Sequence, residues 1–257
     1  MCLAVVAIDA HARYALVVAA NRDEFHARPT APAHWWDDRA PHDLFAGRDL
    51  QAGGTWLGVT RRGRWAFVTN VREPGRPDVA APSRGGLVVR VLDDPHDPAS
   101  ALADAQADGR YNGYNLIAGD VARAAWISNR SPALRALAAG VHGVSNAQLD
   151  TPWPKLERVK TGLAAWARAG DEDVAPLFDL LADRVATPDS ALPETGVPVE
   201  WERLLSSPFI VSPSYGTRSS TVLAVSRDGE ATVRERTFDA TGRATGDVVE
   251  RFALVPR

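Results

Sequence analysis

The chain has 257 residues, of which 45% are hydrophobic and 24% are charged, and its net charge of −3 corresponds to an isoelectric point near 6.1. These values are typical of a soluble globular protein, and we expect one domain spanning residues 1–257. The slight negative charge gives no support for nucleic acid as a partner. No apolar run approaches the roughly 18 residues of a spanning helix, so membrane insertion is not expected.

The chain contains one cysteine, Cys2, so an intrachain disulfide is impossible. The apolar run at residues 3–8 is not preceded by basic residues and ends at Asp9, which is unlike a secretion signal. Both observations predict a cytoplasmic location.

The sequence pattern of the first half of the chain predicts strands and one long loop. Residues 3–8 and 14–20 are short Val-rich runs, which indicate a hairpin of buried strands. Residues 25–54 carry several prolines and glycines with little periodicity, and we expect a long structured loop there. Residues 56–60 and 65–71 are predicted to form a second hairpin, with Gly63 in its turn.

Helices are expected mainly in the middle of the chain. Residues 83–92 carry a helical apolar pattern, and Asp97 followed by Pro98 is typical of a helix start. After a predicted strand pair at 115–118 and 124–128, two amphipathic helices are expected, the first at 155–169. Residues 187–198 read as a Pro-rich loop, and four strands follow at 209–211, 220–226, 232–238 and 250–254. This order favours an α+β protein with largely antiparallel sheets covered by helices.

Cys2 is the most informative residue for function. Removal of the initiator methionine would leave a cysteine whose thiol and free α-amine belong to the same residue. The reference pKa of the amine, about 7.7 to 8.0, is close to that of the thiol, about 8.5, so the amine can accept the thiol proton near neutrality. The alternative is that Cys2 is a small apolar residue at the start of a buried strand.

A polar tetrapeptide, Asn21-Arg22-Asp23-Glu24, ends the second predicted strand. Because side chains alternate along a strand, Asn21 and Asp23 should share one face, and Arg22 and Glu24 the other. A buried Asp23 would hold the cationic amine of residue 2, and Arg22 would lower the thiol pKa or bind a substrate carboxylate. An exposed turn with a local ion pair is the alternative.

Several short motifs together resemble the NRDE family, whose members are similar to Transport and Golgi organisation protein two. The resemblance runs in order over residues 1–225, and its motifs are Met1-Cys2-Leu3, Asn21-Arg22-Asp23-Glu24, Gly53-Gly54-Thr55-Trp56-Leu57-Gly58, Thr69-Asn70, Ser83-Arg84-Gly85, Tyr114-Asn115-Leu116, Ser145-Asn146, Trp153-Pro154-Lys155 and Tyr215-Gly216-Thr217-Arg218. It implies the fold of the N-terminal-nucleophile (Ntn) hydrolases, a four-layer αββα sandwich of antiparallel sheets.

The resemblance also implies catalytic roles. Cys2 matches the nucleophile and Asn146 an oxyanion-binding asparagine, with Asn70 and Arg218 plausible by position. The related hydrolases carry their Arg and Asp three residues apart, whereas Arg22 and Asp23 are adjacent, so Glu24 or Asn21 could hold one of these roles. Asn21, Glu24, Trp56 and Asn115 are the candidates for substrate binding.

Two functions are compatible with these residues. One is an Ntn-type cysteine hydrolase acting on an amide or thioester of a small hydrophobic acyl compound, with no cofactor or metal. The other, which the family resemblance implies, is a cytoplasmic haem carrier that uses the same pocket. The six histidines show no ligand spacing, so a haem ligand would be the Cys2 thiolate or a loop histidine.

Overall fold

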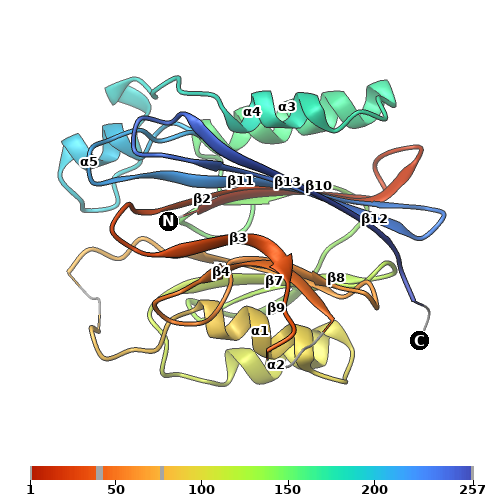
Figure 1. Cartoon of the computed structure of the whole chain (residues 1–257). Coiled ribbons are helices and arrows are strands. Elements are labelled where there is room, and N and C mark those ends of the chain that lie inside the picture. Colours follow the sequence, from red (N-terminus) through yellow and green to blue (C-terminus); the bar gives the residue numbers. More distant parts are fainter. Residues whose placement is uncertain (1, 39–42, 76–77, 256–257) are drawn as a thin grey trace.

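The structure is a computed structural model that describes residues 2–38, 43–75 and 78–255. Two antiparallel sheets lie face to face, and helices cover the outer face of each (Figure 1). The six-stranded sheet has the order β10-β1-β2-β11-β12-β13, and its strands are β1 (Cys2–Ile8), β2 (Tyr14–Phe25), β10 (Gly140–Val144), β11 (Tyr215–Ser226), β12 (Glu230–Phe238) and β13 (Ala244–Ala253).

The second sheet has seven strands in simple chain order, from β3 to β9. Each strand is antiparallel to its neighbours. The strands are β3 (Thr30–Trp35), β4 (Leu44–Asp49), β5 (Leu57–Thr60), β6 (Trp65–Asn70), β7 (Tyr114–Gly119), β8 (Ala124–Ser128) and β9 (Ser131–Ala136).

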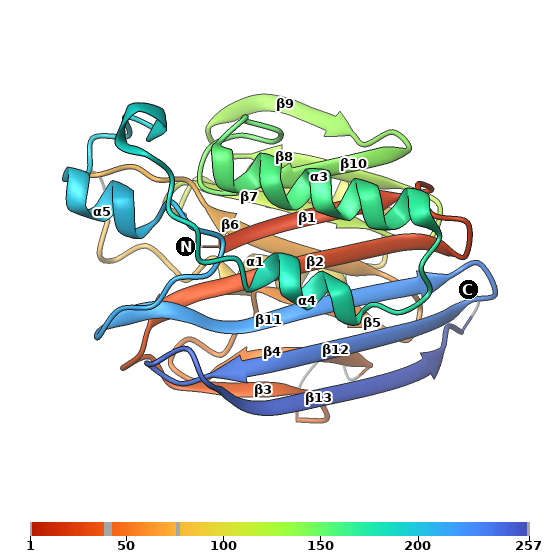
Figure 2. The same cartoon turned by 90° about the horizontal axis from the view of Figure 1, so that it is seen from above.

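Helices form the two outer layers. On the seven-stranded sheet lie α1 (Gly85–Asp93) and α2 (Pro98–Gln106) (Figure 1). On the six-stranded sheet lie α3 (Pro154–Ala169) and α4 (Ala175–Leu181) (Figure 2). A short 3-10 helix (Asp189–Ala191) and α5 (Val199–Leu204) follow near one end of the molecule. The predicted four-layer αββα sandwich is therefore confirmed.

Local sequence explains the longest helix, α3. Pro154 occupies its first turn, and Gly170 ends it with a left-handed φ of 69°. The apolar stripe that includes Leu156 and Leu163 is buried against β1 and the neighbouring helix α4. None of the helices in the described residues is long and apolar enough to cross a membrane.

The first two strands are buried on both faces. Leu3, Val5 and Val17 pack against α3 and α4, whereas Ala4 and Val18 lie in the cluster between the sheets. The predicted hairpin is confirmed, and β2 continues through the polar tetrapeptide to Phe25. Because both faces of β2 are covered, neither the Asn21 and Asp23 side chains nor the Arg22 and Glu24 side chains have to face solvent.

Two sequence-based assignments were wrong. The predicted loop at 25–54 contains β3 and β4, because β3 is an edge strand, where Pro32 can be accommodated without breaking an inner ladder. Residues 209–211 do not form a strand, since their backbone is held by irregular contacts such as Phe209 N–H to the Asp183 carbonyl. Strands β9 and β10 and helix α5 were not predicted, because residues 131–144 lack a clear alternation and α5 is one and a half turns long.

Candidate active site

A cavity of about 430 Å³ opens where β2 ends, and we call it the Arg22 cavity. Five residues singled out from the sequence line it: Arg22, Asp23, Glu24, Trp56 and Asn70. Its remaining wall includes Arg28, Asp49 and the residues that begin α1. The sandwich thus brings the end of one sheet, the rim of the other and a helix N-terminus around one space.

Strand register sets the position of Cys2. Cys2 is the first residue of β1 and pairs directly with Arg22 of β2, while Leu3 pairs with Asn21. Met1 and the side chain of Cys2 lie outside the described part of the structure. The backbone pairing nevertheless brings residue 2 to the strand position beside the Arg22 cavity.

Arg22 is buried between the two sheets, with 5% of its surface exposed. Its Nη1 donates a hydrogen bond to Thr30 Oγ1 over 3.0 Å, and its guanidinium lies 4.5 Å from the ring centroid of Trp56. Among the described residues it forms no ion pair with a carboxylate. A buried guanidinium held by a hydroxyl and an aromatic ring keeps its charge available to an anion in the cavity.

Asp23 is a fully enclosed carboxyl group. Its Oδ1 accepts a 2.7 Å hydrogen bond from Thr217 Oγ1, and its backbone carbonyl accepts one from the Tyr215 hydroxyl. Burial raises the pKa of Asp23, and the charges of Lys155 and Arg22 and the Thr217 hydrogen bond oppose that rise. Asp23 is therefore a buried acid whose charged form needs a cation close by.

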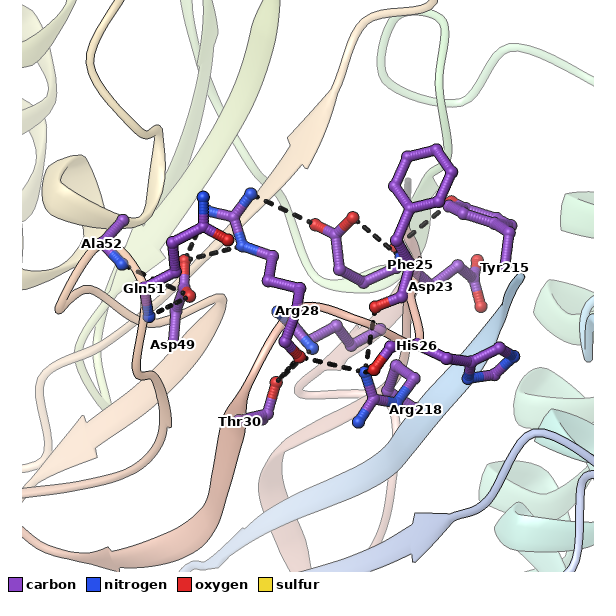
Figure 3. A network of polar contacts seen from close by, with 12 residues as sticks. Asp23, Phe25, His26, Arg28, Thr30, Asp49, Gln51, Ala52, Tyr215 and Arg218 are labelled. Atoms are coloured by element: carbon purple, nitrogen blue, oxygen red, sulfur yellow. Dashed lines mark hydrogen bonds and ion pairs between the residues drawn. The ribbon is translucent and has the colours of Figure 1, made fainter.

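A network on the rim of the cavity was not expected from the sequence (Figure 3). Arg28 donates from Nε and Nη2 to Asp49 Oδ2, at 3.1 and 2.6 Å, and lies 3.8 Å from Glu24. Burial favours a higher pKa for Asp49, but Arg28 and the amides of Gln51 and Ala52 outweigh it, so the pKa is lowered. These contacts tie the β2–β3 turn to the end of β4 and fix one side of the opening.

Asn146 lies behind the cavity wall and supports it. Its Nδ2 donates a 3.0 Å hydrogen bond to the Asn70 carbonyl, and its own carbonyl accepts from Arg72 N–H. Asn70 itself lines the Arg22 cavity, whereas Asn146 is 1% exposed. The two predicted asparagines are therefore neighbours, and Asn70 is the one that reaches the cavity.

Arg218 hydrogen-bonds to the backbone of the turn between β2 and β3. Its Nη1 donates to the carbonyls of Phe25, His26 and Arg28, at 3.0, 3.3 and 3.1 Å (Figure 3). It does not line the Arg22 cavity but a second, smaller one on the other side of Trp56. Its pKa is lowered by burial and by the nearby Arg22.

Two predicted substrate-binding residues lie away from the cavity. Asn21 faces the helical layer, where Nδ2 donates to the carbonyls of Leu181 and Pro208 and Oδ1 accepts from Ser220. Asn115 is 1% exposed in the seven-stranded sheet, bonded to Thr69, Trp126 and the Ala147 carbonyl.

Sequence reasoning missed several site residues, and for one of them a signal was present. Glu235 shares the inward face of β12 with Ala231 and Val233, so a strict two-residue alternation would have identified it as a buried acid. Arg28 and Asp49 fell in the segment expected to be a loop. Lys155 is buried in the first turn of α3 with Nζ on the Leu205 carbonyl; it belongs to the motif Trp153-Pro154-Lys155, but no role was assigned to it from the sequence.

One group of potential metal ligands occurs among the described residues, which the histidine spacing did not suggest. Asp94, His96 and Asp104 place ligand atoms within 4.8 Å of one another beside α1 and α2. The group lies on the surface, outside the Arg22 cavity, and we assign no metal to it. His42 lies outside the described residues.

Solved structures with the same architecture define the fold class. A mutant conjugated bile acid hydrolase from Clostridium perfringens aligns with 98% of this chain and 96% of its own, at a TM-score of 0.52 and 9% identity. A Caenorhabditis elegans N-acylethanolamine-hydrolyzing acid amidase ortholog aligns with 86% of this chain and 92% of its own, at 0.54 and 13%. The chain has the fold of the Ntn hydrolases.

Sequence comparison then gives the family. The family model described as Transport and Golgi organisation 2 matches residues 1–240. The Transport and Golgi organization protein 2 homologs of Bos taurus and Homo sapiens are 37% and 36% identical, each over 88% of this chain and 87% of the relative. The Drosophila melanogaster protein is 30% identical over the same shares. The chain belongs to the Transport and Golgi organisation 2 family.

Proposed function

We propose that this protein is an Ntn-type cysteine hydrolase that cleaves an amide or thioester of a small acyl compound, with Cys2 as its nucleophile. The observation that carries the proposal is the pairing of Cys2 with Arg22 beside a 430 Å³ cavity. The fold supports it, since both structural neighbours named above are hydrolases by their descriptions.

The reaction would begin once Met1 has been removed. The α-amine of Cys2 would take the thiol proton, and the sulfur would form a bond to the substrate carbonyl carbon while the carbonyl π electrons move to oxygen. Arg22, a buried cation on the neighbouring strand, would favour the thiolate. The buried carboxyl group of Asp23 would stabilise the ammonium that forms when the amine takes this proton.

Collapse of the tetrahedral intermediate would release the leaving group. Its nitrogen or sulfur would take the proton from the α-ammonium as its bond to the carbonyl carbon breaks, leaving an acyl thioester on Cys2. Water would then attack that thioester, with the amine again accepting a proton. The C–S bond would break as the carboxylic acid leaves, and the ammonium would return its proton to the Cys2 sulfur. Asn70, which lines the cavity, would donate to the oxyanion, and Asn146 would fix its backbone.

The cavity walls suggest how a substrate would lie. Trp56 and Val68 provide apolar surface for an acyl chain, whereas Arg28, Glu24 and Asp49 add charged groups to the lining. A substrate with an apolar acyl group and a polar leaving group fits this division.

The test uses the fact that Cys2 is the sole cysteine. Intact mass should show loss of Met1, iodoacetamide should label one site, and an acyl-amide and acyl-thioester panel should be turned over by the native protein and not by Cys2→Ala. A variant with one alanine inserted between Met1 and Cys2 is the matched control, because it keeps the thiol but moves the free amine to another residue. Retained Met1, or equal activity in the insertion variant, would contradict the mechanism.

The haem carrier is the second proposal. None of the described residues that line the Arg22 cavity is a histidine, so the ligand in this cavity would be the Cys2 thiolate. This alternative requires a saturable Soret shift on haem addition that Cys2→Ala removes, with no turnover of any acyl compound. A weak absorbance change that persists in Cys2→Ala would exclude it.

A further inference from the structure

A second cavity lies on the other side of Trp56, and we call it the Glu235 cavity. It has about 170 Å³, room for roughly five water molecules. Trp56 lines both cavities. The Glu235 cavity extends from Thr245, which is exposed on β13, inward to Glu235 on β12, which is 1% exposed. It is therefore open to solvent at one end and deep at the other.

Strand register places this cavity beside the candidate active site. Arg22 pairs with Cys2 on one side and with Ser219 on the other, and Ser219 pairs in turn with Thr237. Neighbouring strands lie about 4.8 Å apart, so the backbone of Ser219 is about 10 Å from that of Cys2. Ser219 and Thr237 line the Glu235 cavity. A small extended molecule could occupy both cavities across Arg22 and Trp56.

Two polar groups in the Glu235 cavity lack full hydrogen bonding. Ser219 Oγ is buried and makes no close hydrogen bond within the described residues, although its hydroxyl favours the charged form of Glu235. The Glu235 carboxylate accepts one hydrogen bond on each oxygen, from Ala33 N–H at 2.7 Å and Thr221 Oγ1 at 3.1 Å. A carboxylate has about four acceptor positions, so Glu235 can accept further donors.

Charges of both signs lie around this cavity, so an ion of either sign would meet a like charge and would also lose hydration on entering it. Arg218 lines it and Arg22 acts on Glu235 from β2, two strands away, so a ligand ammonium would meet two guanidinium groups. A ligand carboxylate would meet Glu235. Burial raises the pKa of Glu235 to about 7, against the hydrogen bonds from Ala33 and Thr221 and the charge of Arg22. The lining residues of β3 and β13 add no further charge.

We propose that the Glu235 cavity is a binding subsite for the uncharged, hydrogen-bonding end of a ligand, such as a carboxamide, which donates to Glu235 and accepts from Ser219 Oγ. The subsite rests on the proposed function only in that this ligand would be the hydrolase's substrate, held here by its non-reacting end. Trp56 and Phe238 would flank the ligand's carbon atoms. Binding itself needs no Cys2 chemistry.

The experiment compares three fragments of similar size: propanamide, propanoate and propylammonium. Saturation of amide chemical shifts at Ser219 and Glu235 in ¹⁵N NMR spectra, recorded at pH 7.5 with Cys2→Ser, measures each affinity without turnover. Propanamide should bind at least roughly tenfold more tightly than either ion, and Ser219→Ala should weaken it by roughly tenfold. Equal binding of all three fragments, or no saturable shift at these residues, would overturn the subsite.

Glu235→Gln tests the charge argument directly. This substitution keeps the shape, removes the negative charge and adds an N–H donor, so propanoate binding should rise toward that of propanamide. Glu230→Gln is the matched control, since Glu230 is exposed on the same strand, and it should leave all three affinities unchanged. If Glu235→Gln does not fold, propanoate titrated into the Cys2→Ser protein at pH 6 and pH 8 replaces it: binding should be tighter at pH 6, and pH-independent binding would contradict the proposal. If the native protein turns over no acyl compound but propanamide still binds, the hydrolase proposal is refuted and the subsite proposal is retained.

Discussion

The guanidinium of Arg22 lies 4.5 Å from the centre of the Trp56 ring, at the boundary between the two cavities. Trp56 belongs to the turn that enters β5, and Arg22 to the end of β2, so this contact joins the two sheets at the candidate active site. The stack fixes the direction of the Arg22 charge without neutralising it.

The first prediction concerns the thiol of Cys2. Arg22→Ala should raise the pKa of the thiol by about one unit or more, because it removes the cation on the paired strand position. The pH dependence of iodoacetamide labelling measures this pKa. Arg22→Lys, which keeps the charge but not the planar stack, should shift the profile less. Identical profiles for the native protein and Arg22→Ala would show that Arg22 does not act on the thiol.

The second prediction concerns the rim of the Arg22 cavity. The pKa of Asp49 is lowered in the folded state, so its contribution to stability is present above the ordinary pKa near 3.9 and is lost as pH falls. Asp49→Asn should therefore lower the free energy of unfolding by about 1–3 kcal/mol at pH 7, and by much less at pH 3. Urea unfolding at both pH values measures the difference.

A matched control is Asp189→Asn, because Asp189 forms a similar bidentate contact with Arg203 in which both side chains are about half exposed. Solvent screens such a pair, so little change is expected. Similar destabilisation by both substitutions would mean that the Arg28–Asp49 contact has no special role at the rim.

The four-layer order of the fold was implied by the family resemblance, whereas hydrophobic patterning alone predicted antiparallel sheets covered by helices and missed several strands. Hydrophobic patterning identified the β1–β2 hairpin and α3, because the two strands are short apolar runs and the helix carries one apolar stripe. Pro32 made β3 look like a loop, since the sequence does not show that the strand is at a sheet edge.

The candidate site was predictable only in part, for a related reason. Arg22, Asp23 and Asn70 belong to short motifs, and all three line the Arg22 cavity. Asn21 and Asn115 also belong to such motifs, but the side-chain amide of Asn21 hydrogen-bonds to α4 and that of Asn115 links β7 to β8. The residue type alone does not separate a polar group that faces a cavity from one that satisfies buried backbone.

The third prediction concerns the buried ion pair between Arg72 and Glu202, whose side chains are 4% and 5% exposed. Glu202 belongs to α5, and the backbone N–H of Arg72 donates a hydrogen bond to the Asn146 carbonyl. The ion pair therefore connects α5 to the segment that contacts Asn146. Arg72→Met should cost about 3–5 kcal/mol of unfolding free energy, because it leaves the buried Glu202 charge without its cation and with only the hydrogen bonds from Thr195. The double variant with Glu202→Leu should recover much of that loss. Additive losses in this double-mutant cycle would indicate that the two charges are not coupled.

The fourth prediction concerns pH and the contact between His142 of β10 and Asp150. A hydrogen bond to Asp150, followed by one to the Ala138 carbonyl, raises the pKa of His142 against the effect of burial. A raised pKa means that the stabilisation is fully present below the ordinary value near 6.5 and is lost as pH rises through the folded value.

His142→Gln should therefore destabilise the protein by about 1 kcal/mol at pH 5.5 and by less at pH 8.5, measured by urea unfolding. Asp150→Asn should be costlier than His142→Gln at both pH values, because Asp150 also accepts from Lys160 and from the Gly143 amide. A larger effect of His142→Gln at pH 8.5 than at pH 5.5 would contradict the assignment of a charged His142–Asp150 pair.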